Sequence, residues 1–156
     1  MGLNTALHLA YDAAVTLDTD GQHDVADALR LASWGSEQQL VDTLVLGVRN
    51  LTDAQAPRAN RFSNWISNFF LSRFTGCPLL DTQCGLRRYP LRKTLSLDAY
   101  APGYGWEAQV IIRACQQSIP IEQVPVDVRY GAGTGRSHFH NVQDPVRIIR
   151  AVFGAP

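Results

Sequence analysis

The chain has 156 residues, of which 46% are hydrophobic, enough for one domain with a sizeable core. Its 14 basic and 14 acidic residues cancel, so no overall positive field points to nucleic acid, and no nucleic-acid partner is expected. Cys77, Cys84 and Cys115 lack the spacing of a zinc site and fit a reducing compartment. No signal peptide is visible and no apolar run approaches ~20 residues. These features predict a cytoplasmic protein or one peripheral on the cytosolic face of a membrane.

Helical and strand patterns alternate in the first third of the chain. Residues 2–11 predict a short helix, 13–17 an apolar strand buried on both faces, 24–33 a helix and 42–48 a second buried strand. This alternation predicts an α/β fold with a parallel sheet.

The strand at 13–17 ends abruptly in the run DTDGQHD. This places Asp18 and Asp20 at the carboxyl edge of the strand, where open α/β sheets bind their ligands. Two carboxylates and the side-chain amide of Gln22 offer hard oxygen ligands that suit Mg²⁺ or Mn²⁺. Gly21 permits a turn tight enough to bring Gln22 back toward the same ion. The stretch therefore predicts a divalent-cation site.

Two other interpretations of this stretch remain open. The first is a solvated acidic turn in which Asp24 or Asp27 caps the following helix. The second is a phosphatase of the haloacid-dehalogenase type, which also follows an apolar strand with D-x-D. Such enzymes have Thr or Val where Gln22 stands and usually keep a downstream lysine, for which Lys93, the only lysine, is a poor candidate. A calcium loop of the EF-hand type is excluded because its required Gly and Glu are missing.

Residues 58–75 predict a long helix with two distinct faces. Apolar residues recur at three-and-four spacing, asparagines and serines fill the other side, and arginines lie near the ends. One interpretation is a core helix that packs its aromatic residues onto the sheet. The other is a helix at a membrane interface, with aromatic residues in lipid and arginines on headgroups. A helix that does both at once is a third interpretation. The apolar stripe consists of Phe62, Trp65, Ile66, Phe69, Phe70 and Phe74.

The segment 76–89 predicts a loop that leads into a strand, with a helix beginning at Pro90. Gly85 indicates a backbone conformation or a close approach that other residues do not permit. The basic residues that follow form a local cluster, which is either a solvated face or a group that binds phosphate. This cluster consists of Arg87, Arg88, Arg92 and Lys93.

The last third of the chain predicts four elements. Residues 103–118 form a helix in which Glu107 lies near the N-terminus, a favourable place for a negative charge. Residues 121–128 form a strand whose internal proline indicates an edge position. Residues 129–140 are a glycine-rich loop, and 142–153 are an amphipathic helix.

Several motifs, taken in order, resemble family 2 glycosyltransferases of the GT-A fold. The resemblance is to the branch that contains dolichol-phosphate mannose synthase and related polyprenyl-phosphate sugar transferases. It rests on D-x-D-G-Q-H from Asp18, D-x-x-C-G-L-R from Asp81, and a Gly-rich turn before Trp106 and Glu107. A V-P-V strand and a G-R-S loop at 135–137 follow, so the resemblance runs through almost the whole chain.

The resemblance implies a mixed, mostly parallel sheet and inverting transfer of a sugar from a UDP- or GDP-sugar to polyprenyl phosphate or another membrane-associated acceptor. It also implies that Asp18, Asp20 and Gln22 hold Mg²⁺ or Mn²⁺. If the acceptor is a hydroxyl, Asp81 is the expected catalytic base by position. Contacts to the donor phosphates or to the sugar are expected from Arg49, Arg87, Glu107, Arg136 and Ser137.

The front of the chain departs from the family pattern. Family members carry a base-binding strand and a second strand and helix, roughly sixty to seventy residues, before the D-x-D strand. Here the chain starts inside what looks like the helix before that strand. We therefore expect 1–156 to be a single partial GT-A domain with an exposed sheet edge and exposed apolar surface. The alternative function is that of a truncated or inactive relative, at most an interaction domain.

Overall fold

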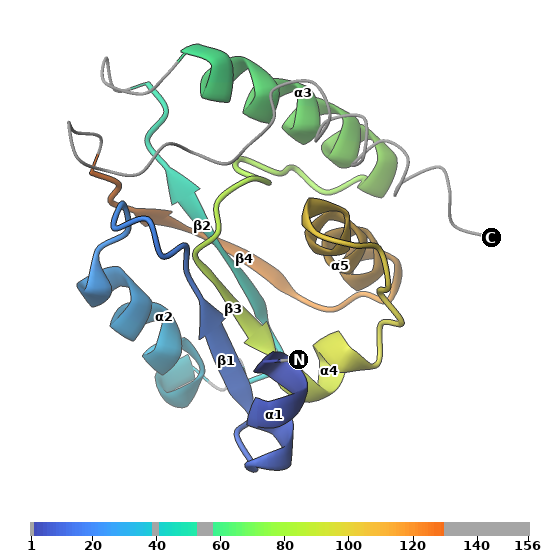
Figure 1. Ribbon diagram of the computed structural model, residues 1–156. Helices are drawn as coiled ribbons and strands as arrows, with labels where there is room; N and C mark the ends of the chain where they lie inside the picture. The colour runs from blue at the N-terminus through green and yellow to red at the C-terminus, as the bar shows by residue number, and fades with distance from the viewer. Residues whose placement is uncertain (1, 39–40, 53–57, 130–156) are drawn as a thin grey trace.

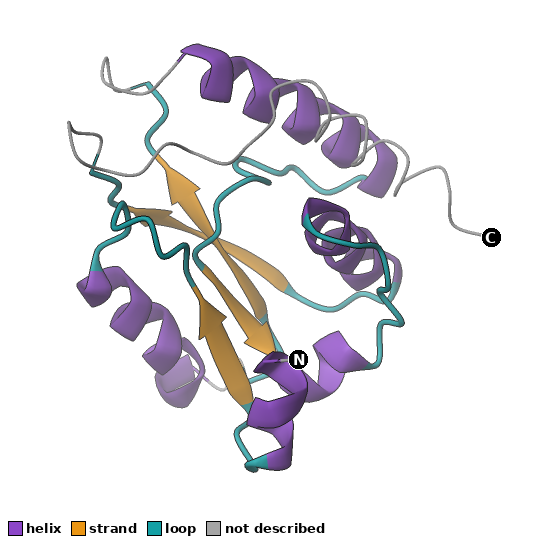
Figure 2. Cartoon of the chain, viewed as in Figure 1, coloured by secondary structure: helices purple, strands orange, loops and turns teal. Residues whose placement is uncertain are grey.

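A computed structural model of the chain describes residues 2–38, 41–52 and 58–129. These residues form one four-stranded sheet with helices on both of its faces, which confirms the predicted α/β class (Figures 1 and 2). The strands are β1 (Ala13–Thr16), β2 (Leu44–Arg49), β3 (Arg87–Pro90) and β4 (Ile121–Val126). The helices are α1 (Gly2–His8), α2 (Val25–Gln38), α3 (Arg58–Thr75), α4 (Leu91–Leu95) and α5 (Tyr104–Gln116).

The strand order is β1-β3-β2-β4. β2 and β4 pair in parallel along their whole lengths. β3 lies between β1 and β2 and runs antiparallel to both, with Arg87 opposite Thr16 on one side and Leu46 on the other. The sheet is therefore mixed, as the resemblance implies. The simpler expectation of a parallel sheet is wrong, because an antiparallel strand separates β1 from β2.

The path of the chain after β2 explains the direction of β3. A parallel connection needs a crossover element that returns to the opposite end of the sheet. α3 does not return along a face of the sheet and lies instead beyond the carboxyl end of β2 (Figure 1). The segment 76–86 therefore enters the sheet from that same end, which brings the residues before β3 beside those that follow β1.

The core has two parts, one on each face of the sheet. Successive residues of a strand point to opposite faces. Leu44 and Leu46 of β2 accordingly belong to one cluster with Ile111 of α5, and Val45 belongs to the other with Leu31 of α2. The prediction that the second strand is buried is thus confirmed for the first four residues of β2, Leu44 to Gly47.

β1 is less buried than its apolar composition predicts. All four of its residues are only half-buried, so the predicted burial on both faces is wrong. The reason is that, within the described ranges, β1 pairs with β3 alone. Beside it is a cavity of about 690 Å³ lined by residues that include Leu3, Gly103 and Trp106. β1 thus presents an open sheet edge, as expected from the sequence.

Two predictions about the other elements are confirmed. The proline-containing strand β4 borders only β2 in the described part of the chain, as expected of an edge strand. Helix α3 has the predicted bounds, 58–75. The predicted amphipathic helix at 142–153 and the glycine-rich loop beyond residue 129 lie outside the described residues.

α3 turns its polar side toward the rest of the molecule. Ser63, Asn64 and Ser67 are buried, whereas Phe62 and Trp65 are more than half exposed. The interpretation of α3 as a core helix that packs its aromatic residues onto the sheet is therefore wrong. The inner face instead forms hydrogen bonds with the segment 79–83, and such bonds require polar side chains.

Candidate active site

The segments that carry most of the predicted site residues lie at one edge of the sheet, where β1 and β2 end and the loop before β3 enters (Figure 1). Asp18 follows the carboxyl end of β1, and Arg49 is the last residue of β2. The segment 81–86 reaches the same edge because it precedes the antiparallel strand β3. The backbone amide of Arg129, which follows β4, donates a hydrogen bond to the carbonyl of Gln22 and so joins the segment after β4 to the loop after β1. The topology thus joins segments that are far apart in the sequence.

The loop after β1 forms the predicted tight turn. The backbone amide of Gln22 donates a hydrogen bond to Oδ1 of Asp20 at 3.0 Å. Gly21, between them, has a φ of 77°, a conformation that glycine adopts without strain. The carbonyl of Gln22 accepts a hydrogen bond from the Arg129 amide at 2.9 Å, which fixes the turn. The use of the Gln22 side chain as a cation ligand stays a prediction.

The carboxylate of Asp18 lies directly against the backbone of Gly85. A Cβ atom at Gly85 would lie within 2.5 Å of both Cγ and Oδ1 of Asp18, so a side chain at this position would require the Asp18 carboxylate to move. Next to it, the Thr16 hydroxyl donates a hydrogen bond of 3.1 Å to the Gly85 carbonyl. The close approach predicted at Gly85 is confirmed, and it joins the D-x-D-G-Q-H motif to the D-x-x-C-G-L-R motif.

Basic groups surround Asp18. The contact with the His23 imidazole, whose Nε2 lies 3.8 Å from Oδ2, lowers the pKa of Asp18 below its ordinary value of 3.8. Burial opposes this effect, while Arg49 and Arg87 add to it. Asp18 is therefore a carboxylate at neutral pH, and its side chain is 59% exposed, so a ligand can reach it. No role was predicted for His23, although its place directly after Gln22 was the available signal.

Asp81 and Arg49 form a bidentate ion pair. Nε of Arg49 donates to Oδ2 of Asp81 at 2.7 Å, and Nη2 donates to Oδ1 at 3.0 Å. The backbone amides of Arg49 and Gln83 donate to the same carboxylate at 3.1 Å each. The Asp81 side chain is 1% exposed. Asp81 thus holds the Arg49 guanidinium at the edge where Asp18 lies.

Arg87 and Glu107 form a second ion pair beneath the edge. Nη2 of Arg87 lies 2.9 Å from Oε2 of Glu107, in the first turn of α5 as predicted. Nε of Arg87 also donates to the Cys84 carbonyl at 2.8 Å. Burial, the largest single influence, would lower the pKa of Arg87, but the charge of Glu107 together with contributions from Tyr89 and Cys84 raises it, so the guanidinium stays charged. Within the part of the chain that the structure describes, its Nη1 is buried without a hydrogen-bond partner.

The predicted basic cluster is divided by the sheet pairing. Arg87 and Arg88 belong to β3 and are both buried. Nη1 of Arg88 donates to the Thr43 carbonyl at 3.0 Å. Arg92 and Lys93 belong to α4 and are exposed. The interpretation as one solvated face is therefore wrong, since neighbouring strands cover half of the cluster.

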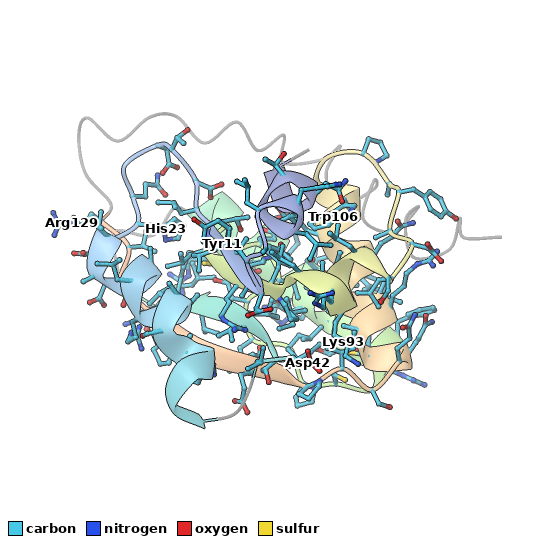
Figure 3. The ribbon with its side chains drawn as sticks, turned by 90° about the horizontal axis from the view of Figure 1, so that it is seen from below. Tyr11, His23, Asp42, Lys93, Trp106 and Arg129 are labelled. Atoms are coloured by element: carbon cyan, nitrogen blue, oxygen red, sulfur yellow. The ribbon has the colours of Figure 1, made fainter. Side chains whose placement is uncertain are left out.

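The only lysine of the chain lies far from the acidic edge. Lys93 is 3.9 Å from Asp42, which precedes β2 and so marks the opposite end of the sheet. Figure 3 shows Lys93 beside Asp42 and well away from His23. A haloacid-dehalogenase mechanism that relies on a lysine beside the nucleophilic aspartate has no lysine here to supply it.

The residues at the edge fit a divalent cation that is shared with a phosphate ligand. Among the described residues, no group of three or more His, Cys, Asp or Glu could hold a metal ion by itself. Mg²⁺, however, is commonly bound by one or two carboxylates together with phosphate oxygens. Asp18, held against Gly85, and Asp20 supply such carboxylates. The donor set therefore suits a metal–diphosphate complex better than a metal alone.

The fold and site define an α/β protein with an acidic, arginine-flanked edge, and comparisons with known proteins relate it to polyprenyl-phosphate sugar transferases. An undecaprenyl-phosphate mannosyltransferase of Micrococcus luteus is 26% identical over 131 residues, which are 80% of this chain and 52% of the relative. A UDP-N-acetylglucosamine–dolichyl-phosphate N-acetylglucosaminyltransferase of Methanococcus voltae is 28% identical over 134 residues, 83% of this chain and 53% of the relative.

These comparisons set the scope of the similarity. The chain spans about half the length of the two curated relatives. No family profile and no solved structure matches it. Two predicted site residues, Arg136 and Ser137, lie outside the described residues. Within the described ranges, no helix is both long and apolar enough to cross a bilayer.

Proposed function

We propose that the chain carries the metal- and diphosphate-binding part of an inverting glycosyltransferase. It transfers a sugar from a UDP- or GDP-sugar to a polyprenyl phosphate at the cytosolic face of a membrane. The observation that carries the proposal is the packing of the Asp18 carboxylate on Gly85, where the charge of Arg49 helps to lower the pKa of Asp18. The two relatives, whose names give undecaprenyl and dolichyl phosphate acceptors, support the class of acceptor.

In this proposal Asp18, Asp20 and Gln22 hold Mg²⁺ or Mn²⁺ against the donor diphosphate. The bound ion supplies Lewis-acid stabilisation of the negative charge that develops on the leaving diphosphate. Arg49 adds a fixed positive charge at the same edge, because Asp81 holds its guanidinium in place before the donor binds. Arg136 and Ser137 are proposed to contact the donor phosphates as well.

The acceptor chemistry decides whether a base is needed. An oxygen of a polyprenyl phosphate is already anionic, so it forms a bond to the anomeric carbon without losing a proton. The bond from that carbon to the diphosphate breaks, and its electron pair leaves with the nucleoside diphosphate. A hydroxyl acceptor would require a base, for which Asp81 was predicted. Since four donors already occupy the buried Asp81 carboxylate, we propose that it positions Arg49 instead.

The remaining predicted residues act below the edge. We propose that Glu107 keeps the Arg87 guanidinium charged and fixed under the loop that carries Gly85. Arg87 then contributes positive potential to the site, as its effect on the Asp18 pKa indicates. Direct contact with the sugar is proposed only for Glu107, whose side chain is 29% exposed.

Calorimetry with UDP-glucose and GDP-mannose tests the proposal. We expect binding in the presence of Mn²⁺, no binding with a chelator, and loss of binding in Asp20→Ala. Asp42→Ala is the matched control because it removes one carboxylate at the opposite end of the sheet. Metal-independent binding, or equal binding by the Asp20→Ala variant, would contradict the proposed site.

A second candidate function is an interaction domain without catalysis, which is favoured by the exposed aromatic residues on α3. A transfer assay with radiolabelled donor and a polyprenyl phosphate separates the two. Labelled lipid product supports the transferase. Metal-dependent donor binding without any product supports the interaction domain.

A further inference from the structure

The outer face of α3 is a continuous row of exposed aromatic side chains. The exposed fractions are 64% for Phe62, 63% for Trp65, 56% for Phe69, and 45% for both Phe70 and Phe74. The rings of Phe62, Trp65 and Phe69 stack in series, with centroids 6.2 and 6.1 Å apart. Exposed apolar surface of this extent normally marks a binding surface. We name these five residues the aromatic stripe.

The opposite face of α3 is fixed to the molecule by hydrogen bonds. The Asn68 side chain donates to the Leu80 carbonyl at 2.6 Å and accepts from the Thr82 amide at 2.9 Å. The hydroxyls of Ser67 and Thr82 lie 2.8 Å apart. The Gln83 amide group donates to the Ser63 hydroxyl at 3.0 Å. Rotating α3 to bury its aromatic stripe would break these hydrogen bonds. They therefore keep the stripe facing outward.

The charge of α3 indicates which partner it fits. The helix sequence, RANRFSNWISNFFLSRFT, contains three arginines and no acidic residue. Arg61 and Arg73, near its two ends, are exposed. A second copy of the helix laid against the first would bring like charges together, whereas anionic lipid headgroups complement them. Aromatic residues flanked by arginines match the interface of a bilayer.

We infer that the aromatic stripe of α3 inserts into the interface of an anionic bilayer, with Arg61 and Arg73 on lipid phosphates. This inference does not rest on the proposed sugar transfer, because it follows from the exposure and charge of α3 alone. It has a consequence for that transfer. The segment that the inner face of α3 holds also carries Asp81, which positions Arg49. Membrane docking would therefore place the candidate site one helix away from the lipid.

Co-sedimentation of the full chain with vesicles tests the inference. We expect binding to phosphatidylcholine vesicles that contain phosphatidylglycerol, weaker binding to pure phosphatidylcholine, and release at high salt. The double variant Trp65→Ser/Phe69→Ser should lower the partition coefficient at least about tenfold, because aromatic side chains bury large apolar areas. It should retain the circular dichroism spectrum and thermal unfolding of the parent, since these side chains point to solvent.

The matched control is Val25→Ser/Leu29→Ser on α2. These two apolar residues have the same spacing as Trp65 and Phe69, and each is 66% exposed. The control should bind vesicles like the parent. Equal binding by the α3 variant and the parent, or no binding by the parent at low salt, overturns the inference. A parent that dimerises through the stripe, becomes monomeric in the α3 variant and ignores vesicles also overturns it.

A second measurement separates a bilayer from another part of the same chain. The fluorescence of Trp65, taken as the difference between the parent and Trp65→Phe, should be quenched by iodide in buffer and protected by anionic vesicles. Emission that is already protected in buffer means that the chain covers its own stripe, which overturns the inference. Calorimetric donor binding is expected to be equal in the parent and the α3 variant, so failure of the proposed transfer and failure of membrane docking give different results.

Discussion

Asp18 and Asp81 lie at the same edge of the sheet, yet their surroundings are opposite. The Asp18 side chain is 59% exposed and rests on a glycine, Gly85, where any side chain would displace its carboxylate. The Asp81 side chain is 1% exposed, and both of its oxygens accept hydrogen bonds from Arg49 and Gln83. The Asp18 carboxylate is accessible to a ligand, whereas the Asp81 carboxylate is buried and hydrogen-bonded within the protein.

The difference shows how position within a motif separates two roles of the same residue type. Asp18 follows a strand and faces the open edge, so its negative charge is available to a cation. Asp81 lies between the inner face of α3 and the end of β2, where an unpaired charge would be costly. Arg49 supplies the pairing. We therefore expect substitutions at Asp81 to affect stability first and substitutions at Asp18 to affect binding first.

The largest expected effect is the loss of stability in Asp81→Ala. Removing one partner of a buried ion pair leaves the other charge without compensation, which costs about 3–5 kcal/mol. Urea denaturation measures the change in the free energy of unfolding. Asp42→Ala, which breaks the exposed pair with Lys93, is the control and should cost less than about 1 kcal/mol. Similar losses in the two variants would mean that Asp81 and Arg49 are not a structural pair.

Two glycine substitutions sharpen the comparison between stability and binding. In Gly47→Ala the new Cβ meets the backbone carbonyl of Leu86 at 2.7 Å, and a backbone atom moves only at a cost of about 1–3 kcal/mol. In Gly85→Ala the new Cβ displaces the exposed Asp18 carboxylate, which can turn toward solvent. We expect Gly85→Ala to retain most of its stability but to bind the Mn²⁺–donor complex at least about tenfold more weakly.

Denaturation and calorimetry on both glycine variants check this prediction. Gly47→Ala should unfold at lower urea concentration while it binds the donor normally below its transition. A Gly85→Ala variant that binds the donor as tightly as the parent would show that the contact between Gly85 and Asp18 has no part in binding.

The smallest expected effect is the pH dependence of stability at Asp18. Its pKa in the folded protein is lower than 3.8, so the folded state holds fewer protons than the unfolded state in acid. The stabilisation from the charge of Asp18 is therefore fully present above about pH 3.8, and it is lost as the pH falls through the pKa that Asp18 has in the folded protein. Since the side chain is largely exposed, the effect should stay below about 1 kcal/mol.

Thermal or urea unfolding of the parent and of Asp18→Asn across this pH range measures the effect. The difference in stability between the two proteins should shrink toward zero in acid. A difference that stays constant, or grows as the pH falls, contradicts the assigned role of His23 and the arginines around Asp18.

Local signals in the sequence predicted the bounds of α3, but not which way this helix faces, and they placed the end of α2 five residues too early. α3 has the bounds that were predicted, and just beyond its end Gly76 has a φ of 72°, typical of a helix C-terminus. The apolar period of α3 shows that it has two faces. Which face lies inward depends on hydrogen bonds that Asn68 accepts from Thr82 and that join the hydroxyls of Ser67 and Thr82, and local periodicity does not reveal these partners.

The candidate site was predictable where a motif forms it and hidden where pairing across the sheet forms it. The turn at Gly21 and the close approach at Gly85 follow from the need for glycine at those places. The direction of β3 depends on where α3 lies, so the burial of Arg87 and its contact with Glu107 had no local signal. The pairing of Arg49 with Asp81 likewise joins residues that are 32 positions apart.

The most direct test of the central claim is the binding of Mn²⁺ followed by its electron paramagnetic resonance signal, with and without GDP or UDP. We predict that the parent and Asp42→Asn deplete the free Mn²⁺ signal beyond the level that the nucleoside diphosphate alone produces, and that Asp18→Asn does not. Equal depletion by the parent and Asp18→Asn would contradict the assignment of this edge as a metal–diphosphate site.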